Sequence, residues 1–455
     1  MDRREFLSTT SAAVGLYLAS ATAQAAPARV ERPNVIYLFS DEHRYQSMSF
    51  TELPQVHTPH LARMAREGFS FQQCISNYPV CSPYRGMLLS GRWPYQNGVI
   101  DNGIELPHGT QTVAHRFQEA GYRTGYIGKW HLGGERAEPF GFEHSLIWTG
   151  TNVHWDTSKY HPADGAPVQP KGYNATLMTD QGLDFIRAHK DERFFLTLSL
   201  NPPHSKFTDP PKEKLALYPK DSIPYRPNVR LDAAAEQTVM KNNGYPHYEG
   251  YHGHISAIDG EVGRVMALLE ELDLVKNTVL VYGSDHGSMH GSQGLGGKRQ
   301  CYEESIHVPL LVWQPGVIPP GSSTSALIGT IDMFPTLCGL AGLSVPGACQ
   351  GQDFSPWVYE GHGPDPEHQF LMHIQKTNAS SGDKHPAPIF RGVRTKTHTF
   401  AHGPGGYHRL YDNIADPYQM NDLSEKPEHQ ALRQQLAEAT RGWLKKAEDP
   451  YELVL

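Results

Sequence analysis

Four short runs rich in apolar residues most constrain what this chain can fold into. They cover residues 34–40, 122–128, 193–200 and 278–283. The run at 34–40, NVIYLFS, is almost continuously apolar, which is typical of a strand buried on both faces in a parallel sheet. Helical patterns alternate with these runs and cover residues 58–68, 112–120 and 251–272. A further strand is expected at 308–313. The alternation predicts an α/β fold with a mixed, mainly parallel sheet flanked by helices.

The alternation of strand and helix patterns ends at about residue 360. Short strand-like segments separated by Gly, Pro and Asn turns are followed by one polar helix, which predicts a small α+β domain with an antiparallel sheet. The strand segments are 368–374, 389–394, 398–401 and 408–411, and the helix is 427–447. A chain of 455 residues has room for both parts. We therefore expect a large domain at 27–360 and a small one at 361–455.

Residues 1–26 resemble a targeting segment. Arg3-Arg4 begins a twin-arginine motif, a mildly apolar run follows at 12–19, and small residues suited to cleavage lie at 21–25. The run is too short for a membrane span, which needs about 20 apolar residues. We expect export by the twin-arginine machinery to the periplasm or beyond, with a mature chain starting near Ala26 and no stable membrane insertion.

Composition excludes some classes of protein. The 40 basic and 48 acidic residues give a net charge of −8 with no basic block, which argues against nucleic-acid binding. Hydrophobic residues make up 38%, enough for a core, so wholesale disorder is excluded. The five cysteines are an odd number, so at least one has no partner in the chain. Cys338 and Cys349 either pair after export or stay as thiols.

Reactive side chains follow each of the four predicted strands. The strands lead in turn to Asp41-Glu42-His43, Lys129-Trp130-His131, Asn201-Pro202-Pro203-His204 and Ser284-Asp285-His286. In open α/β sheets, ligands bind beyond the carboxyl ends of the strands. The sequence therefore predicts one pocket with carboxylates for a cation and with lysines and histidines for an anion. Taken singly, each group has an ordinary alternative role in a helix cap, a turn or a loop.

The segment Cys81-Ser-Pro-Tyr-Arg85 begins a predicted helix that ends at Gly91. A cysteine at a helix N-terminus lies in a positive field, and Arg85 lies one turn further on the same face. This arrangement suits a nucleophile that faces an anion. The alternative is a buried structural cysteine with a nearby surface arginine, because so short a motif is weak by itself.

The CSPYR segment, continued by GMLLSGRWP, resembles the signature of type I (formylglycine-dependent) sulfatases of the alkaline phosphatase superfamily. Further similar blocks are PNVIYLFSDEHR, GYIGKWHLG, NPPHSKF, GSDHG, GGKRQCYEESIHVPLLV and RLYDNIADPYQMNDL. They follow in the family's order and span nearly the whole chain after residue 26. The resemblance implies an alkaline-phosphatase-like sheet domain followed by a small C-terminal domain.

The resemblance also implies a role for each site residue. Cys81 would be converted to formylglycine by a maturation enzyme and act as the nucleophile. The metal ligands would be Asp41, Glu42, Asp285 and His286, and the sulfate would be held by Arg85, Lys129, His131, His204 and Lys298. Glu42 departs from the family's usual Asp or Gln, and His286 from its usual Asn. We expect Ca²⁺, although an imidazole ligand moves the preference toward Mn²⁺ or Zn²⁺, and Mg²⁺ is a further alternative.

The resemblance implies a sulfuric ester hydrolase, and export favours sulfated carbohydrates as substrates. His131 would take a proton during sulfate release, and His204 or Lys298 would protonate the leaving alcohol. The alternatives are an aryl- or choline-type sulfatase, a phosphonate or phosphate ester hydrolase, and a non-catalytic binder of anionic glycans. We expect sugar selection by loops 150–175 and 201–248 and by exposed basic groups of the small domain. Candidate sugar contacts are Arg391, His402, His408, Trp93, Tyr95, His154, Trp155 and Tyr160, with packing in the core or in loops as the equal alternative for the last five. His254, His402 and His408 are expected to be mainly structural.

Overall fold

The computed structural model describes residues 30–149, 152–231, 248–375 and 387–455. The predicted twin-arginine segment and the expected mature start near Ala26 lie outside these ranges. Within them, no helix combines the length and the apolar character that a membrane crossing requires.

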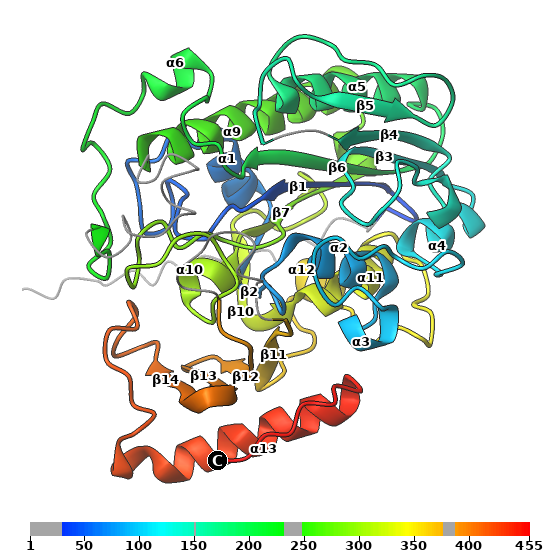
Figure 1. The fold of residues 1–455 in the computed structure, drawn as a ribbon. Helices are drawn as coiled ribbons and strands as arrows, with labels where there is room; N and C mark the ends of the chain where they lie inside the picture. The colour runs from blue at the N-terminus through cyan, green and yellow to red at the C-terminus, as the bar shows by residue number, and fades with distance from the viewer. Residues whose placement is uncertain (1–29, 150–151, 232–247, 376–386) are drawn as a thin grey trace, which may run out of the picture.

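A ten-stranded sheet forms the centre of the large domain (Figure 1). Its strands are β1 (Asn34–Asp41), β2 (Phe69–Ile75), β3 (Arg123–Lys129), β4 (His144–Thr149), β5 (Lys159–Pro162), β6 (Phe194–Pro203), β7 (Thr278–Ser284), β8 (His307–Val308), β9 (Leu310–Trp313) and β10 (Ser322–Gly329). They lie in the order β10-β2-β9-β7-β1-β6-β3-β4-β5, with β8 paired to β2. The strands from β7 through β4 pair in parallel, and β5, β8 and β9 run antiparallel. The predicted mixed, mainly parallel sheet is confirmed.

Helices cover both faces of this sheet (Figure 1). One face carries α1 (Pro59–Glu67), α5 (Asn174–Ala188) and α9 (Tyr248–Glu271), and the other carries α2 (Cys81–Ser90), α4 (Val113–Glu119), α11 (Met333–Leu340) and α12 (Ser355–Glu360). Along β1, Val35, Tyr37 and Phe39 join the core under α2, α4 and α11. Ile36 and Leu38 join the core under α1, α5 and α9. Successive side chains of a strand point to opposite faces, which is why the run at 34–40 is apolar throughout.

The expected strand at 308–313 is divided into β8 and β9, and β9 pairs antiparallel with β7. Pro309 lies between the two pieces and has no backbone N–H to donate, so it interrupts the ladder. The expected loop at 150–175 contains β5, and the expected loop at 201–248 contains the short helix α6 (Lys212–Leu215). Further short helices are α3 (Pro94–Asn97) and α10 (Glu303–Ile306).

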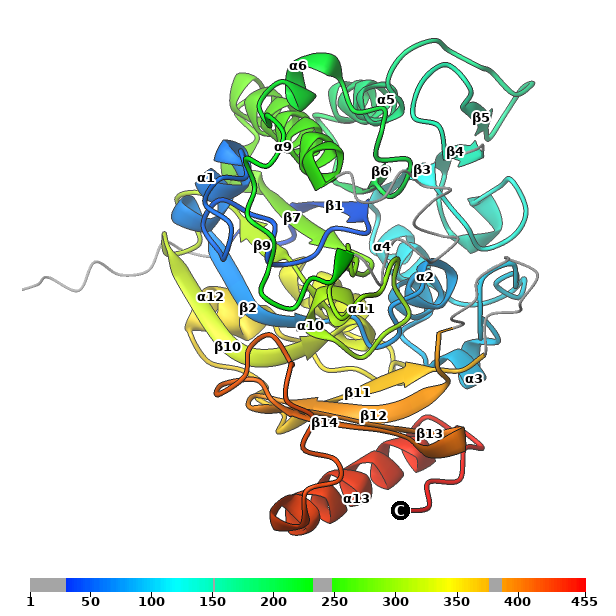
Figure 2. The same cartoon turned by 60° about the vertical axis from the view of Figure 1, so that its left-hand side comes forward.

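The C-terminal part is a four-stranded antiparallel sheet with one long helix against it (Figure 2). The strands are β11 (His368–His373), β12 (Phe390–Thr395), β13 (His398–Gly403) and β14 (Tyr407–Asp412), and the helix is α13 (Gln430–Lys446). Phe370, Val393 and Leu410 of the sheet share a core with Leu436 of α13. The predicted α+β arrangement is confirmed, and β11 lies next to β10 of the large sheet.

Candidate active site

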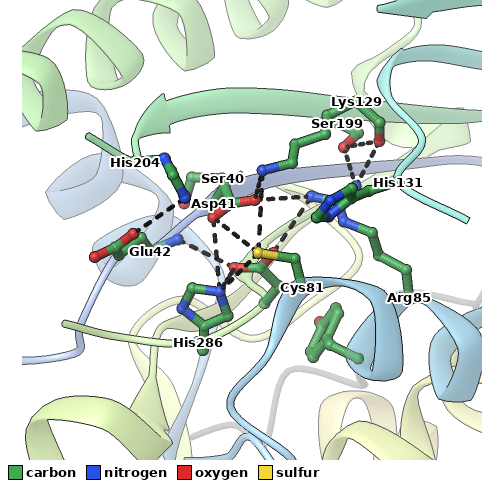
Figure 3. A network of polar contacts seen from close by, with 12 residues as sticks. Ser40, Asp41, Glu42, Cys81, Arg85, Lys129, His131, Ser199, His204 and His286 are labelled. Carbon is green, nitrogen blue, oxygen red and sulfur yellow. Dashed lines mark hydrogen bonds and ion pairs between the residues drawn. The ribbon is translucent and has the colours of Figure 1, made fainter. Parts of the chain in front are cut away.

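The carboxyl ends of three adjacent strands bring the predicted groups together. β1 lies between β6 and β7, with Asp41 opposite Pro203 of β6 and Ser40 opposite Ser284 of β7. Because the strand ends are aligned in this register, Asp41, His204 and Asp285 lie at the same edge of the sheet. β3 on the far side of β6 ends at Lys129. Figure 3 shows Asp41 and Lys129 next to the first residue of α2, and His204 beside Glu42.

Cys81 is that first residue, and its side chain is almost fully buried. Helix α2 begins after the extended Val80, has Pro83 in its first turn where proline is tolerated, and ends at Gly91 in a left-handed conformation with φ 63°. The side-chain oxygen of Asn102 accepts the Ser82 N–H at 2.9 Å, so one free N–H of the first turn is satisfied. The positive end of the helix dipole is directed at the Cys81 side chain.

Cationic groups surround the Cys81 sulfur, and Figure 3 shows Lys129 and His286 among them. Its Sγ lies 3.3 Å from His286 Nε2, 3.3 Å from Lys298 Nζ and 4.0 Å from Lys129 Nζ. Burial and the Asp41 carboxylate would raise the pKa of Cys81, but Lys129, Lys298 and His286 outweigh them and hold it well below its ordinary value. A cysteine with a depressed pKa in a cationic site is reactive rather than structural.

Two carboxylates lie side by side next to this sulfur. Asp41 and Asp285 are completely buried, and Arg85 Nη2 lies 3.3 Å from one oxygen of each. Burial and the neighbouring Asp41 raise the pKa of Asp285 to about 7. For Asp41 burial acts in the same direction, but Lys129, 2.6 Å away, and Lys298 outweigh it and lower the pKa. A close pair of buried carboxylates is a typical site for a divalent cation.

Arg85 is a buried residue and not the surface arginine of the alternative interpretation. Its Nη1 donates to the Lys129 carbonyl oxygen at 2.5 Å and to Ser199 Oγ at 2.6 Å. The guanidinium therefore fixes the end of β3 to the end of β6 while it also contacts both carboxylates. Arg85 thus holds three elements of the site in register.

The four predicted metal ligands divide into two groups. Oxygens of Asp41 and Asp285 and a nitrogen of His286 lie close enough together to share one ion, with the Cys81 sulfur beside them. The Glu42 carboxylate lies instead 3.2 Å from Lys298 Nζ and 3.6 Å from His204 Nε2. Glu42 has a φ of 77°, and its backbone N–H donates to Asp285 at 3.1 Å. The donor set of Asp41, Asp285 and His286 fits a divalent cation, and Glu42 as a ligand stays a prediction.

The two predicted histidines lie on opposite sides of Cys81 (Figure 3). His131 follows β3 with a φ of 57°, and burial, together with nearby Lys129, lowers its pKa although Cys81 acts in the opposite direction. Burial, Lys298 and Lys129 lower the pKa of His204 to about 4. Lys298 contacts Cys81 and two carboxylates, and these outweigh burial and raise its pKa. In the free site the imidazole of His204 is therefore neutral and the amine of Lys298 charged.

A pocket of about 530 Å³ opens onto this cluster. Five of the predicted catalytic residues line it, namely Cys81, Lys129, His131, His204 and Lys298. Sequence reasoning missed other lining residues, including Asn102, Glu105, Trp148 and Asn152. Asp101-Asn102-Gly103 is a sequence typical of a turn, and Trp148 lies near the end of β4, whose neighbours no local pattern reveals.

Several expected sugar contacts are placed elsewhere. Trp93 and Tyr160 are buried in the core, and none of Trp93, Tyr95, His154, Trp155 and Tyr160 lines this pocket. Arg391 is a buried partner of Asp449, and His402 bonds to Tyr451 Oη and the Val454 carbonyl oxygen, both at 2.7 Å. His408 packs against His402. The expectation of an exposed basic group is therefore wrong for Arg391, whereas His402 has the structural role that was expected for it, and both stabilise the small domain.

The His154, Asp209 and His254 side chains form a second buried polar cluster beside the pocket rim. Asp209 accepts from His154 Nδ1 at 2.7 Å, and His254 Nε2 donates to the Lys206 carbonyl oxygen at 3.0 Å. The other His254 nitrogen lies 2.7 Å from Tyr173 Oη. These bonds hold the segment that contains Asn152 against residues 206–209, so both histidines are structural, as predicted for His254.

All five cysteines are free thiols. Of the two expectations for Cys338 and Cys349, a disulfide or two thiols, the structure shows two thiols. Cys74, Cys301 and Cys338 are buried, and burial raises the pKa of each. Cys81 differs from them because its pKa is lowered. The direction of its pKa shift thus distinguishes Cys81 chemically from the buried structural cysteines.

The fold and the site define a hydrolase of the alkaline phosphatase-like superfamily, with a cysteine of lowered pKa at a helix N-terminus between a buried carboxylate pair and basic side chains. Residues 33–343 match the sulfatase family model, and residues 291–446 match the model described as N-sulphoglucosamine sulphohydrolase, C-terminal. The chain belongs to the sulfatase family and is a sulfuric ester hydrolase.

Characterised relatives cover nearly the same length. An ulvan-active sulfatase of Formosa agariphila is 31% identical, covering 89% of this chain and 80% of the relative. An endo-4-O-sulfatase of Bacteroides thetaiotaomicron is 29% identical, covering 96% and 97%. A solved structure of a protein bound to its substrate, D-glucosamine-2-N,6-O-disulfate, has a TM-score of 0.82 at 25% identity and covers 92% of this chain and 99% of its own.

Proposed function

We propose that this protein is an exported sulfatase that removes sulfate from sulfated carbohydrates, with Cys81 converted to formylglycine as the nucleophile. The observation that carries the proposal is the convergence of Lys129, Lys298 and His286 on the Cys81 sulfur beside a buried carboxylate pair. We assign the signal segment to 1–26, the catalytic domain to 27–360 and the small domain to 361–455. The intact set of reactive groups argues against a non-catalytic glycan binder.

The sulfur of Cys81 marks the place of the two hydroxyls of a formylglycine hydrate. One hydroxyl, in its deprotonated form, attacks the sulfate sulfur, and the S–O bond to the sugar breaks. His204 or Lys298 gives the departing sugar oxygen its proton. His131 then takes the proton of the second hydroxyl, the C–O bond to sulfate breaks, and the aldehyde is restored. Arg85, Lys129 and Lys298 stabilise the negative charge in both steps.

Asp41, Asp285 and His286 would hold a divalent cation, with Glu42 as the fourth predicted ligand. Two hard carboxylates favour Ca²⁺, and the imidazole keeps Mn²⁺, Zn²⁺ and Mg²⁺ as alternatives. Such an ion neutralises sulfate charge and lowers the pKa of the attacking hydroxyl. The chain's own residues favour the ionised form of the carboxylates, because Arg85 contacts both of them and Lys129 contacts Asp41.

The substrate class is proposed from the relatives, whose names include sulfatases that act on ulvan and on N-acetylglucosamine-6-O-sulfate. Aryl- and choline-sulfatases are relatives at 25% and 26% identity, so these activities are the second candidate. Phosphonate monoester hydrolases share the fold at 19% and 22% identity. Rates on matched aryl sulfate, aryl phosphate and aryl phosphonate esters decide among these reactions, and a faster phosphoryl reaction would contradict the proposal.

The sugar specificity is tested with oligosaccharides of matched length that carry one sulfate. The bounded pocket and the rim braced by His154, Asp209 and His254 favour a terminal sulfated residue over a position within a chain. We expect faster sulfate release from chains sulfated at the non-reducing end than from chains sulfated internally. Ion chromatography of free sulfate measures both rates, and preference for internal positions would overturn the exo assignment.

A further inference from the structure

The segment that carries Lys298 is attached to the small domain along its length. Arg299 Nη1 lies 3.1 Å from His373 Nε2, Cys301 Sγ lies 3.3 Å from Tyr407 Oη, and the Glu303 N–H donates to Gln419 at 2.9 Å. Arg394 also forms an ion pair of 2.7 Å with Glu303. These residues follow Lys298 directly, but their partners lie at least 70 positions further along the chain.

Arg299 connects this segment to the nucleophile as well. Its Nη1 donates to Asp101 Oδ1 at 2.8 Å, and the same oxygen accepts the Asn102 N–H at 2.8 Å. Asn102 in turn accepts the N–H of Ser82, the neighbour of Cys81. One continuous chain of hydrogen bonds therefore runs from His373 of β11 through Arg299 to the first turn of α2.

The small domain supplies a fixed acceptor at the start of this chain. His373 is buried, and its Nδ1 lies 2.6 Å from the Pro388 carbonyl oxygen, which accepts only. Nδ1 therefore carries the proton, and Nε2 is left as an acceptor for Arg299. Burial and Arg299 also lower the pKa of His373 to about 3, so the imidazole stays neutral.

Arg299 adopts a backbone conformation that needs such contacts. Its φ of 71° lies in the left-handed region, which an arginine rarely occupies and which the surrounding structure must stabilise. The peptide between Lys298 and Arg299 takes its direction from this conformation. Loss of the Arg299 contacts would therefore free the backbone that points Lys298 at Cys81.

We propose that Arg299, held by His373 of the small domain, is the positioning residue that keeps Lys298 directed at the nucleophile and aligned with the start of α2. The proposal rests on the proposed function, in which Lys298 contacts the reacting sulfate. The small domain is then a part of the active site, because one of its buried histidines fixes a catalytic lysine of the large domain.

The test compares Arg299→Ala with Arg299→Lys, Asp101→Asn and Lys298→Ala in the full-length matured enzyme. Misplacement of a catalytic group by about 1 Å lowers rates by about 10²-fold, so we expect Arg299→Ala to lose about that much in kcat/KM, mostly in kcat. Asp101→Asn keeps an acceptor for the Asn102 N–H and is expected to lose less. Arg299→Lys is expected to recover part of the rate. Arg123→Ala, which removes an exposed ion pair at the opposite end of β3, is the matched control.

Added guanidinium ion separates positioning from a general loss of structure. At millimolar concentration it is expected to restore several-fold activity to Arg299→Ala and none to Lys298→Ala, because only the first variant leaves a guanidinium-shaped space next to Asp101 and His373. Melting temperatures confirm that each variant is folded at the assay temperature. If Arg299→Ala does not fold, Asp101→Asn carries the test.

The outcomes distinguish this inference from the function on which it rests. A matured parent enzyme without sulfatase activity overturns the proposed function and the inference together. An active parent whose folded Arg299→Ala variant stays within about threefold of its rate overturns the inference alone. An impaired Arg299→Ala variant that guanidinium does not rescue also overturns it, since the loss then comes from structure.

Discussion

The amine of Lys298 lies 3.3 Å from the sulfur of Cys81, across 217 positions of the chain. Cys81 begins helix α2, and Lys298 lies in the loop between β7 and α10. A charged lysine at this distance stabilises negative charge on the Cys81 side chain or on a group bound to it. This contact joins two distant segments of the large domain at one site.

Replacement of Cys81 tests the nucleophile. We expect Cys81→Ala to abolish turnover and keep the fold, because one small side chain at a helix start is lost. Cys81→Ser should be nearly inactive as well, since a serine has no second hydroxyl on the same carbon to expel sulfate. Steady-state sulfate release measures both variants, and a serine variant with most of the parent activity would refute the formylglycine mechanism. Mass spectrometry of the Cys81 peptide should show oxygen in place of sulfur in the parent.

Removal of the cation tests the carboxylate pair. We expect a chelator to lower both activity and melting temperature, because Asp41 and Asp285 then repel each other in a buried site. Asp285→Asn should lose bound metal, measured by elemental analysis. Asp365→Asn, at an exposed ion pair with Lys396, is the control and should keep it. Active parent enzyme without any divalent ion would contradict the site.

Lys129→Ala and Arg85→Lys test the anion pocket. Each change removes or displaces a donor to the charge that develops on sulfate, so we expect kcat to fall about 10²-fold. Lysine replaces arginine at position 85 because Arg85 is buried between two carboxylates, and its removal would leave them unpaired. Initial rates on an aryl sulfate provide the measurement. A loss below about threefold for Lys129→Ala would argue against its role.

Glu303 makes part of the stability depend on pH. Burial alone would raise its pKa, but Arg394 and His307 outweigh burial and hold the pKa well below the ordinary value of 4.5. A depressed pKa in the folded state stabilises the protein above the unfolded pKa, and this stability is lost as the pH falls below about 4.5. We expect Glu303→Gln to cost about 3 kcal/mol at neutral pH, the scale for breaking a buried ion pair.

Urea unfolding at several pH values measures this dependence. The difference between parent and Glu303→Gln should stay constant from neutral pH down to about 4.5 and shrink as the pH falls further below that value. Glu438→Gln removes an exposed pair with Arg441 and is expected to change stability by less than about 1 kcal/mol at any pH. A Glu303→Gln deficit that stays constant below pH 4.5 as well would show that packing, and not the charge, is what the variant loses.

Replacement of Arg3-Arg4 by Lys-Lys tests the export route. A twin-arginine substrate crosses the membrane folded, so Cys81 must be modified in the cytoplasm before the fold buries it. We expect the Lys-Lys variant to accumulate as precursor inside the cell, with Cys81 already converted. Immunoblots of cell fractions measure this, and export at the parent rate would exclude the route but leave the activity untouched.

Much of the architecture was predictable because local sequence patterns determine where strands and helices form. The apolar run at 34–40 is β1, and the helix expected from Cys81 to Gly91 is α2. The missed features depend on contacts that no local pattern records. Trp93 looked available for sugars but packs against Phe370 and Trp443 of the small domain. Arg391 looked like an exposed basic group, but it is paired with Asp449, 58 positions away.

The sequence alone determined the alternation of strands and helices, because burial on both faces requires apolar runs and because helix starts and ends depend on nearby residues. It also determined which reactive side chains follow each strand, and parallel strands must place such groups at one edge. Only the tertiary structure decided how these groups pair. It turned Glu42 toward Lys298 and His204, and it fixed Arg299 between Asp101 and His373. Such pairings depend on side-chain directions set by packing between distant segments, and local sequence carries no record of them.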